Sequence, residues 1–223
     1  MEYLQMIFNG GPIMIAIAGC SLVAAFIFLE KWFQFHRAQV NVRELVNGLI
    51  NALRRDGMIE AITLCDHTPG PVARLLTAAI QAYQNDDDVR GSMEDASIIE
   101  LPRLESHLNI LATIAYIAPL LGLLGTVVGM ADAFQAIQAK QGISLSLADL
   151  SSGIYTALAT TAAGLCVAIP SHIAYNYLVS KVNAFCVDME KASSEILYFF
   201  NHHKRARQTD DVAGTSDSNS DKA

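Results

Sequence analysis

Four threonines stand out because they lie in stretches that carry no charged side chain. Thr156, Thr160 and Thr161 fall within one such stretch, and Thr126 falls within another. A threonine hydroxyl does not exchange protons near neutral pH, but its oxygen can hold water or bind a hard cation such as sodium. The four residues are therefore candidates for the polar lining of an ion route.

The same hydroxyls have a second, structural use. In a membrane helix a threonine often donates a hydrogen bond to the backbone carbonyl four residues earlier, which bends the helix and has no transport role. Taken singly, and judged by residue type alone, each threonine fits this structural use better than a transport role.

Small residues recur at helix-face spacing in the same stretches. Three glycines between Pro119 and Met130 are spaced three or four residues apart, and Gly164 follows Thr161 at the same spacing. Lipid gives membrane helices no hydrophobic reason to associate, so close packing of small residues drives association instead. The predicted helix-packing residues are Pro119, Gly122, Gly125, Gly129, Gly164 and Pro170.

These residues lie within two of the three long stretches of the chain that contain no charged side chain, here called windows. The windows cover 3–29, 108–131 and 151–180, and each exceeds the roughly 20 apolar residues that a helix needs to cross a bilayer. Hydrophobic residues make up 52% of the 223-residue chain, which is high for a soluble domain. The sequence therefore predicts an all-α membrane protein with three transmembrane helices and long helical cytoplasmic extensions.

Basic residues predict the orientation of these helices. None precedes the first window, eight lie between Lys31 and Arg103, Lys140 alone separates the second and third windows, and six follow from Lys181 onward. The positive-inside rule then places the N-terminus outside, and the long loop and the C-terminus in the cytoplasm. Because the start of the chain has no basic residue and no small-residue cleavage site, we expect it to be retained rather than removed as a signal peptide.

The windows and their flanks give the predicted order of segments. They are a periplasmic N-terminus (1–11), a first transmembrane helix (12–30), a cytoplasmic helical loop (31–107), a second transmembrane helix (108–131), a periplasmic hairpin (132–150), a third transmembrane helix (151–180), a cytoplasmic helix (181–203) and a disordered tail (204–223). The tail is predicted to be disordered because it is polar, rich in Asp and Ser, and free of aromatic residues.

The cytoplasmic loop has amphipathic periodicity on both sides of the turn sequence HTPGP, residues 67–71. We expect one helix on each side of that turn. A further helix is predicted to start near Ser92 and to run on into the second span, with a bend at Pro102. Arg103 and Glu105 are expected to pair with neighbours on this helix, which adds little stability at a surface.

Other function classes have little support in the sequence. The net charge of −7 and the lack of a basic stripe argue against a nucleic-acid partner. The four cysteines form no CxxC pair, and the acidic run Asp86–Asp88 lacks the spacing of a calcium-binding loop. Nucleotide-binding, hydrolase and zinc-protease motifs are missing. We therefore expect a protein that is not an enzyme and that needs neither a cofactor nor a metal.

Two stretches resemble a known family. LPRLESHLNILATIAYIAPLLGLLGTVVGM, Leu101 to Met130, and GIYTALATTAAGLCVAIPSHIAYN, Gly153 to Asn176, are similar to the MotA/TolQ/ExbB proton channel family, and the early first span and short hairpin fit its ExbB/TolQ branch. The resemblance implies a homopentameric ring in the bacterial inner membrane. It also implies a partner like ExbD or TolR, with one membrane helix and a periplasmic domain, present as two copies inside the ring.

The function that the resemblance implies is that of an ion-driven motor. Proton or sodium flow past the ring would move the partner, which would then do mechanical work for energised transport at the outer membrane. In the family an aspartate on the partner's helix takes up and releases the ion, while hydroxyls and a carboxylate of the ring line the route. Thr126 and Thr161 match the family's membrane threonines.

One position departs from the family pattern. Thr156 stands where ExbB-like and TolQ-like members usually have a glutamate, so the ion preference, proton or sodium, stays open, and all proton handling would fall to the partner if none remains in the ring. The alternative function is a non-conducting scaffold with the same ring architecture. Transport or packing roles for Thr156 and Thr160 both remain open.

Three other polar residues lie near the ends of the spans. His172 follows Pro170 by two residues near the inner end of the third span, where a structural role is expected. Asp132 and Asp149 flank the outer hairpin. They either mark helix ends in water or form a vestibule that attracts cations.

Overall fold

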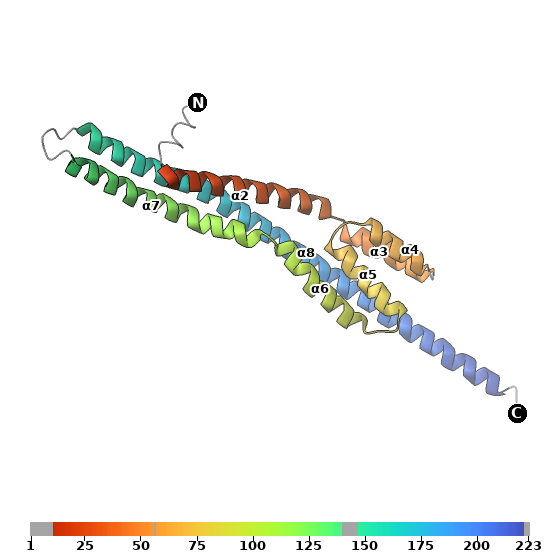
Figure 1. Ribbon diagram of the computed structural model, residues 1–223. Coiled ribbons are helices and arrows are strands. Elements are labelled where there is room, and N and C mark those ends of the chain that lie inside the picture. Colours follow the sequence, from red (N-terminus) through yellow and green to blue (C-terminus); the bar gives the residue numbers. More distant parts are fainter. Residues whose placement is uncertain (1–10, 56, 140–146, 221–223) are drawn as a thin grey trace. The chain divides into compact units, whose positions relative to one another are not determined.

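The computed structural model describes residues 11–55, 57–139 and 147–220, and within these ranges the chain forms α-helices and no strand (Figure 1). The helices are α2 (Gly11–Ala38), α3 (Val42–Arg54), α4 (Met58–His67), α5 (Pro71–Gln84), α6 (Val89–Glu105), α7 (Leu108–Ala139) and α8 (Leu147–Ser220). Candidate membrane spans that are long and apolar enough lie within Gly11–Ala38, Val89–Gln135 and Ser151–His202. The predicted all-α fold with three membrane helices is confirmed.

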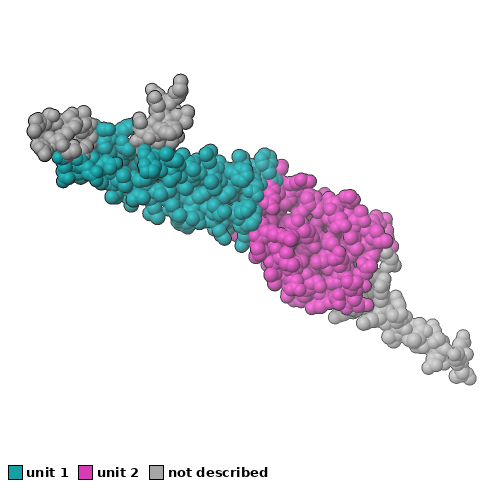
Figure 2. Space-filling view, viewed as in Figure 1, with its two compact units in different colours: residues 1–33, 105–180 teal, residues 34–104, 181–223 magenta. Residues whose placement is uncertain are grey.

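The chain divides into two compact units, which are coloured separately in Figure 2. Unit 1 contains residues 1–33 and 105–180, and unit 2 contains residues 34–104 and 181–223. The three uncharged windows fall in unit 1, and most of the predicted cytoplasmic segments fall in unit 2.

Unit 1 exposes large apolar side chains on each of its long helices. Examples are Leu22 at 75% exposure on α2, Leu120 at 62% on α7 and Leu158 at 65% on α8. A soluble domain rarely leaves such large apolar patches in water. Lipid is the solvent that this surface suits, as the window lengths predict.

Unit 2 has a conventional apolar core. Leu49 of α3, Leu75 and Ile80 of α5, and Ile196 of α8 are fully buried in it. The apolar residues of α3 recur three and four positions apart, so one stripe of the helix faces the core. This long-range packing brings residues 189–200 of α8 against α3 and α5, which begin more than a hundred residues earlier.

Three boundaries differ from those predicted by the sequence. The loop before the HTPGP turn forms two helices rather than one, because α3 ends at Arg54 and α4 begins at Met58, just after Gly57. Gly57 donates its backbone N–H to the carbonyl oxygen of Ala52 at 3.1 Å. Glycine favours such a stop because it lowers helix stability by about 1 kcal/mol relative to alanine.

The predicted single helix from Ser92 into the second span is also two helices. α6 ends at Glu105, α7 begins at Leu108, and His107 between them has a positive φ of 65°. Pro102 lies within the last turn of α6, where its missing N–H weakens the helix. The sequence therefore correctly predicted an irregularity near Pro102, but it predicted a bend within one helix where the chain instead makes a turn between two helices.

The third difference concerns the end of the chain. The backbone of α8 continues to Ser220, whereas composition predicts disorder from residue 204. The side chains from residue 203 onward lie outside the described residues, and the predicted disorder of the tail stays a prediction.

Candidate functional site

The predicted packing glycines lie where α7 and α8 approach most closely. A Cβ atom added to Gly125 would lie 2.6 Å from the Cβ atom of Thr160, and one added to Gly164 would lie 2.6 Å from the carbonyl oxygen of Ala118. Gly122 and Gly129 are buried against α8 in the same way, with Thr161 Cα and Ala157 Cβ each 3.1 Å from the added atom. At Gly125 and Gly164 an added Cβ atom would collide with the facing helix, whereas at Gly122 and Gly129 it would require the neighbouring atoms to shift by a few tenths of an ångström.

Two of the four candidate threonines belong to this interface. Thr160 is 2% exposed, and its hydroxyl donates to the carbonyl oxygen of Ala157 at 2.8 Å. Thr161 is half-buried, and its hydroxyl crosses to α7, where it donates to the carbonyl oxygen of Gly122 at 3.0 Å. The crossing bond is possible because Gly122 has no side chain in the way.

The other two threonines lie at the edges of the helix pair. Thr126 is half-buried and donates to the carbonyl oxygen of Leu123 at 2.6 Å, and Thr156 is half-buried and donates to that of Ser152 at 3.1 Å. All four hydroxyls thus donate to backbone carbonyls, but only that of Thr156 donates to the carbonyl four residues earlier, and that of Thr161 donates to another helix. Each oxygen still has lone pairs with which to accept from water or to bind a cation.

The two prolines of the predicted packing set lie inside their helices. Pro119 is half-buried in α7, and Pro170 is exposed on α8. Pro170 lines an apolar groove of about 550 Å³ between α2 and α8. Trp32 of α2 stacks on Tyr177 of α8 at this groove, with ring centroids 5.6 Å apart.

His172 has a partner that the sequence did not indicate. Its ring meets that of Tyr116 on α7 edge to face, with centroids 5.8 Å apart, and both side chains are exposed. Asp132 is exposed near the end of α7, and the side chain of Asp149 lies outside the described residues. The vestibule interpretation of these two aspartates therefore stays a prediction.

Two buried charged residues were missed by the sequence. Lys31 of α2 is 1% exposed, and its ammonium group donates to the hydroxyl of Ser106 at 2.8 Å, beside the break between α6 and α7. Nearby, Glu30 lies 3.7 Å from the His107 imidazole. In the sequence Lys31 follows almost directly on an apolar run, and nothing in its spacing signals burial.

The second missed residue is Glu100 of α6, which is 3% exposed. Its carboxylate pairs with Arg74 of α5 at 2.6 Å and with Arg103 of α6 at 2.9 Å. Arg103 thus has the neighbour that the sequence predicted, but that neighbour is buried and is shared with a second helix. The pairing fixes α6 against α5 within unit 2.

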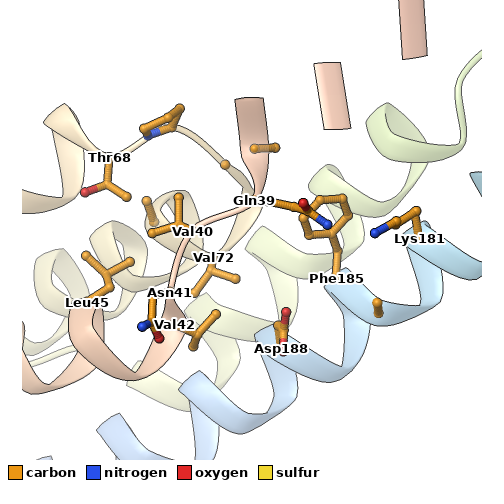
Figure 3. A pocket seen from close by; sticks show the side chains of 15 residues that line it. Gln39, Val40, Asn41, Val42, Leu45, Thr68, Val72, Lys181, Phe185 and Asp188 are labelled. Carbon is orange, nitrogen blue, oxygen red and sulfur yellow. The ribbon is translucent and has the colours of Figure 1, made fainter. Parts of the chain in front are cut away.

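Unit 2 also contains a cavity of about 360 Å³, shown in Figure 3. Gln39, Asn41 and Thr68 surround it together with Lys181 and Asp188 of α8, and the remaining lining is largely apolar. This mixture of one cation, one carboxylate, amides and apolar surface favours no single class of ligand. Among the described residues no cluster of three or more His, Cys, Asp or Glu side chains could hold a metal ion.

Residues 67–191 match the MotA/TolQ/ExbB proton channel family. The matched part begins at the end of α4 and includes the α7–α8 pair with all four threonines. The chain belongs to this family. The predicted relationship to its ExbB/TolQ branch is confirmed by individual relatives.

One relative is an ExbB homologue of Methanothermobacter thermautotrophicus named for biopolymer transport. It is 30% identical over 182 residues, which cover 81% of this chain and 64% of that protein. An ExbB-like protein of Synechocystis is 30% identical over 79% of this chain and 70% of its own length. The Tol-Pal system protein TolQ of Haemophilus influenzae is 38% identical over 99 residues, 43% of this chain and 42% of that protein. The chain therefore spans a little under two thirds of the first of these relatives.

Membership in the family, together with three apolar helices, makes this chain a membrane protein of a proton-channel family rather than of an enzyme family. The roles of the individual threonines, the partner and the orientation in the membrane are separate questions.

Proposed function

We propose that this chain is the ring subunit of an ion-driven motor in the bacterial inner membrane. Five copies surround the membrane helices of an ExbD/TolR-like partner, and proton or sodium flow along the α7–α8 pairs moves that partner. The partner then does mechanical work for energised transport at the outer membrane. The N-terminus lies in the periplasm and the C-terminus in the cytoplasm, as the distribution of Lys and Arg predicts.

The observation that carries the proposal is the set of hydroxyls on α7 and α8. Thr126, Thr156, Thr160 and Thr161 lie in windows without Asp, Glu, Lys or Arg, and each donates its hydrogen to a carbonyl. A hydroxyl whose hydrogen is already engaged presents its lone pairs outward, which is the orientation that a cation or a water donor needs. Thr126, Thr156 and Thr161 are half-buried in the single chain and can present an oxygen at its surface.

The absence of a glutamate at position 156 is consistent with a complex in which the partner, and not the ring, carries the acidic group. An ionisable group at the middle of a membrane is costly, roughly 2.5 to 3.5 kcal/mol on insertion scales, and is kept only for a function. With Thr156 in place of a glutamate, the ring offers oxygen ligands, and the partner supplies the acidic group. Each ion that crosses releases about 2.3 kcal/mol per 100 mV, so several ions are enough to move a bistable assembly.

Ion flux through the assembled complex tests the proposal. The chain is co-purified with a single-span candidate partner, which is sought in a neighbouring open reading frame, and reconstituted in liposomes that contain a pH dye or a sodium dye. We expect flux that requires the partner and that follows one of the two ion gradients. Replacing Thr156 by Glu is expected to shift the preference towards protons, because it adds a group that titrates.

A non-conducting scaffold is the second candidate, and a specific observation favours it. Every candidate hydroxyl donates to a backbone carbonyl. A packing role therefore accounts for the four threonines without any bound ion. An assembled, correctly oriented complex that passes neither protons nor sodium would establish the scaffold and exclude the motor.

A further inference from the structure

The α7–α8 pair exposes a polar strip that its membrane position does not explain. On α7 it consists of Asn109, Thr113 and Tyr116, spaced four and three residues apart, so that they share one helix face. On α8 it consists of His172 and Asn176, also four residues apart. All five side chains are exposed.

The two halves of the strip meet. The Tyr116 and His172 rings are in edge-to-face contact with centroids 5.8 Å apart, and Tyr116 is 65% exposed. The strip is therefore continuous across two helices rather than a set of isolated polar residues. The Thr113 hydroxyl donates to the carbonyl oxygen of Asn109 at 2.7 Å. Its oxygen can therefore still accept a hydrogen bond from water or bind a cation, as described for the four threonines.

The strip lies inside the uncharged windows 108–131 and 151–180, toward their inner ends. Amide and imidazole groups that face hydrocarbon lose their hydrogen bonds at a cost of several kcal/mol. The neighbouring surface of α8 shows the contrast. Ile173, Pro170 and Cys166 line the groove toward α2, which is apolar and suits lipid.

We propose that Asn109, Thr113, Tyr116, His172 and Asn176 line a water-filled stretch of the ion route, and that His172 is its proton-exchanging group. This inference rests on the proposed function, because the ion that the water carries is the one that drives the motor. Thr156 stands where relatives usually have a glutamate, so the ring lacks that titratable group. An imidazole can take its place, because this type of side chain gains and loses protons close to neutral pH. His172 is the one histidine in the three windows.

The surroundings of His172 leave it free to act in this way. Tyr116 faces it from α7. The α2 residues that line the adjacent groove are Ser21, Ala24, Ala25, Phe28 and Trp32, and none of them carries a titratable side chain. At the inner ends of these helices unit 1 carries Glu30, Lys31 and Glu105. Lys31 donates to the Ser106 hydroxyl, and Glu30 lies 3.7 Å from the His107 imidazole.

Thiol labelling of the intact complex tests the water-filled stretch. The four native cysteines are replaced by alanine, and single cysteines are introduced as Tyr116→Cys, His172→Cys and Ile173→Cys. Ile173→Cys is the matched control, because Ile173 is 65% exposed and adjacent in sequence but lies on the apolar groove. A thiol reacts as the thiolate, which forms in water and not in hydrocarbon.

A charged, membrane-impermeant reagent is expected to label Tyr116→Cys and His172→Cys at least about tenfold faster than Ile173→Cys. Equal slow labelling at all three positions would overturn the proposal, because the strip would then face lipid or another copy of the chain. The labelling does not depend on ion flow. A complex with the expected labelling and no flux would therefore overturn the motor while leaving the hydrated strip in place.

The role of His172 is tested by flux. His172→Gln keeps a polar side chain but removes the titrating group, and we expect proton flux to fall by about tenfold or more. His36→Gln is the control, because it makes the same change at an exposed histidine of α2 that lies outside the strip. Proton flux that is unchanged in His172→Gln, in a complex with normal subunit content, would overturn the proton-exchanging role.

Discussion

The hydroxyl of Thr161 donates a hydrogen bond to the carbonyl oxygen of Gly122 at 3.0 Å, and this bond joins α8 to α7. A Cβ atom at Gly122 would lie 3.1 Å from the Cα atom of Thr161, so the bond depends on the absent side chain. One threonine thereby has a packing role and a proposed transport role at the same place. The two roles have different experimental consequences.

Thr161→Val separates these roles. Loss of the hydroxyl is expected to lower stability by only about 0.6 kcal/mol, the average value for a hydrogen bond between membrane helices. If the hydroxyl lines the ion route, flux falls much further, by about tenfold. Flux in liposomes and thermal unfolding in detergent measure the two effects independently.

Thr161→Ser is the matched control, because it keeps the hydroxyl and removes only a methyl group. We expect Thr161→Ser to keep most of the flux. If the valine and serine variants conduct equally well, Thr161 is a packing residue and its assignment to the ion route is wrong. Thr126→Val, alone and combined with Thr161→Val, extends the same comparison to α7.

Gly125→Ala is expected to destabilise unit 1. The new Cβ atom would lie 2.6 Å from the Cβ atom of Thr160, so the two helix backbones must separate. Overpacking of this kind costs about 1 to 3 kcal/mol, which would appear as a lower midpoint of thermal unfolding and weaker assembly. Gly19→Ala on α2 is the control, since a Cβ atom there meets nothing within 4 Å. Equal midpoints for the two variants would show that α7 and α8 are not held at this separation.

Glu100→Gln is expected to loosen α6 from α5 in unit 2. The carboxylate is 3% exposed and pairs with Arg74 and Arg103, whereas both arginine side chains are more than half exposed and partly screened by water. We therefore expect a loss of about 1 to 3 kcal/mol rather than the full cost of breaking a buried ion pair.

Hydrogen exchange of α5 and α6 amides in the purified complex checks this expectation. Glu94→Gln, on the same helix but exposed, is the matched control and should change stability by less than about 0.5 kcal/mol. Similar exchange rates in the two variants would mean that the Glu100 ion pairs contribute no more than a surface charge.

Cys65 is expected to resist alkylation in the folded protein. Burial raises the pKa of its thiol from 9.0 to about 11, Asp66 adds to the rise, and a hydrogen bond with Thr77 opposes it. At pH 8 the thiolate fraction is then about a hundredfold lower than for a thiol of pKa 9. Iodoacetamide labelling followed by peptide mass analysis measures this, with the denatured protein as the reference. Rapid labelling of folded Cys65 would contradict the burial.

The same pKa shift predicts how alkaline pH affects stability. In the unfolded chain Cys65 loses its proton near pH 9, whereas the folded protein retains it up to about pH 11. The unfolded state then binds fewer protons, so the Cys65 contribution to stability is complete below pH 9 and is lost as the pH rises toward 11. The free energy of unfolding, measured by denaturation at a series of pH values from 8 to 11, should fall less steeply with pH for Cys65→Ala than for the natural chain. Parallel curves would show that Cys65 does not contribute.

Local patterns were enough to predict much of this protein. Three uncharged windows fixed the membrane helices, since a backbone in hydrocarbon must satisfy its own hydrogen bonds and a helix does so. The glycines at 122, 125, 129 and 164 were identified by spacing alone, because residues three and four apart share a helix face. The motif stretches were also sufficient to indicate the family.

The remaining features depend on contacts between residues far apart in the chain. The turn at His107, the burial of Lys31 and Glu100, and the meeting of Tyr116 with His172 each need two or more helices in place. Sequence periodicity assigns a residue to a face of its own helix, but not to the neighbour that the face will meet. The sequence by itself therefore determined which segments are long and apolar enough to cross a membrane and which residues are small enough to pack there. Only the tertiary structure decided which polar groups are buried together and which are left exposed, because burial is a property of the assembled helices.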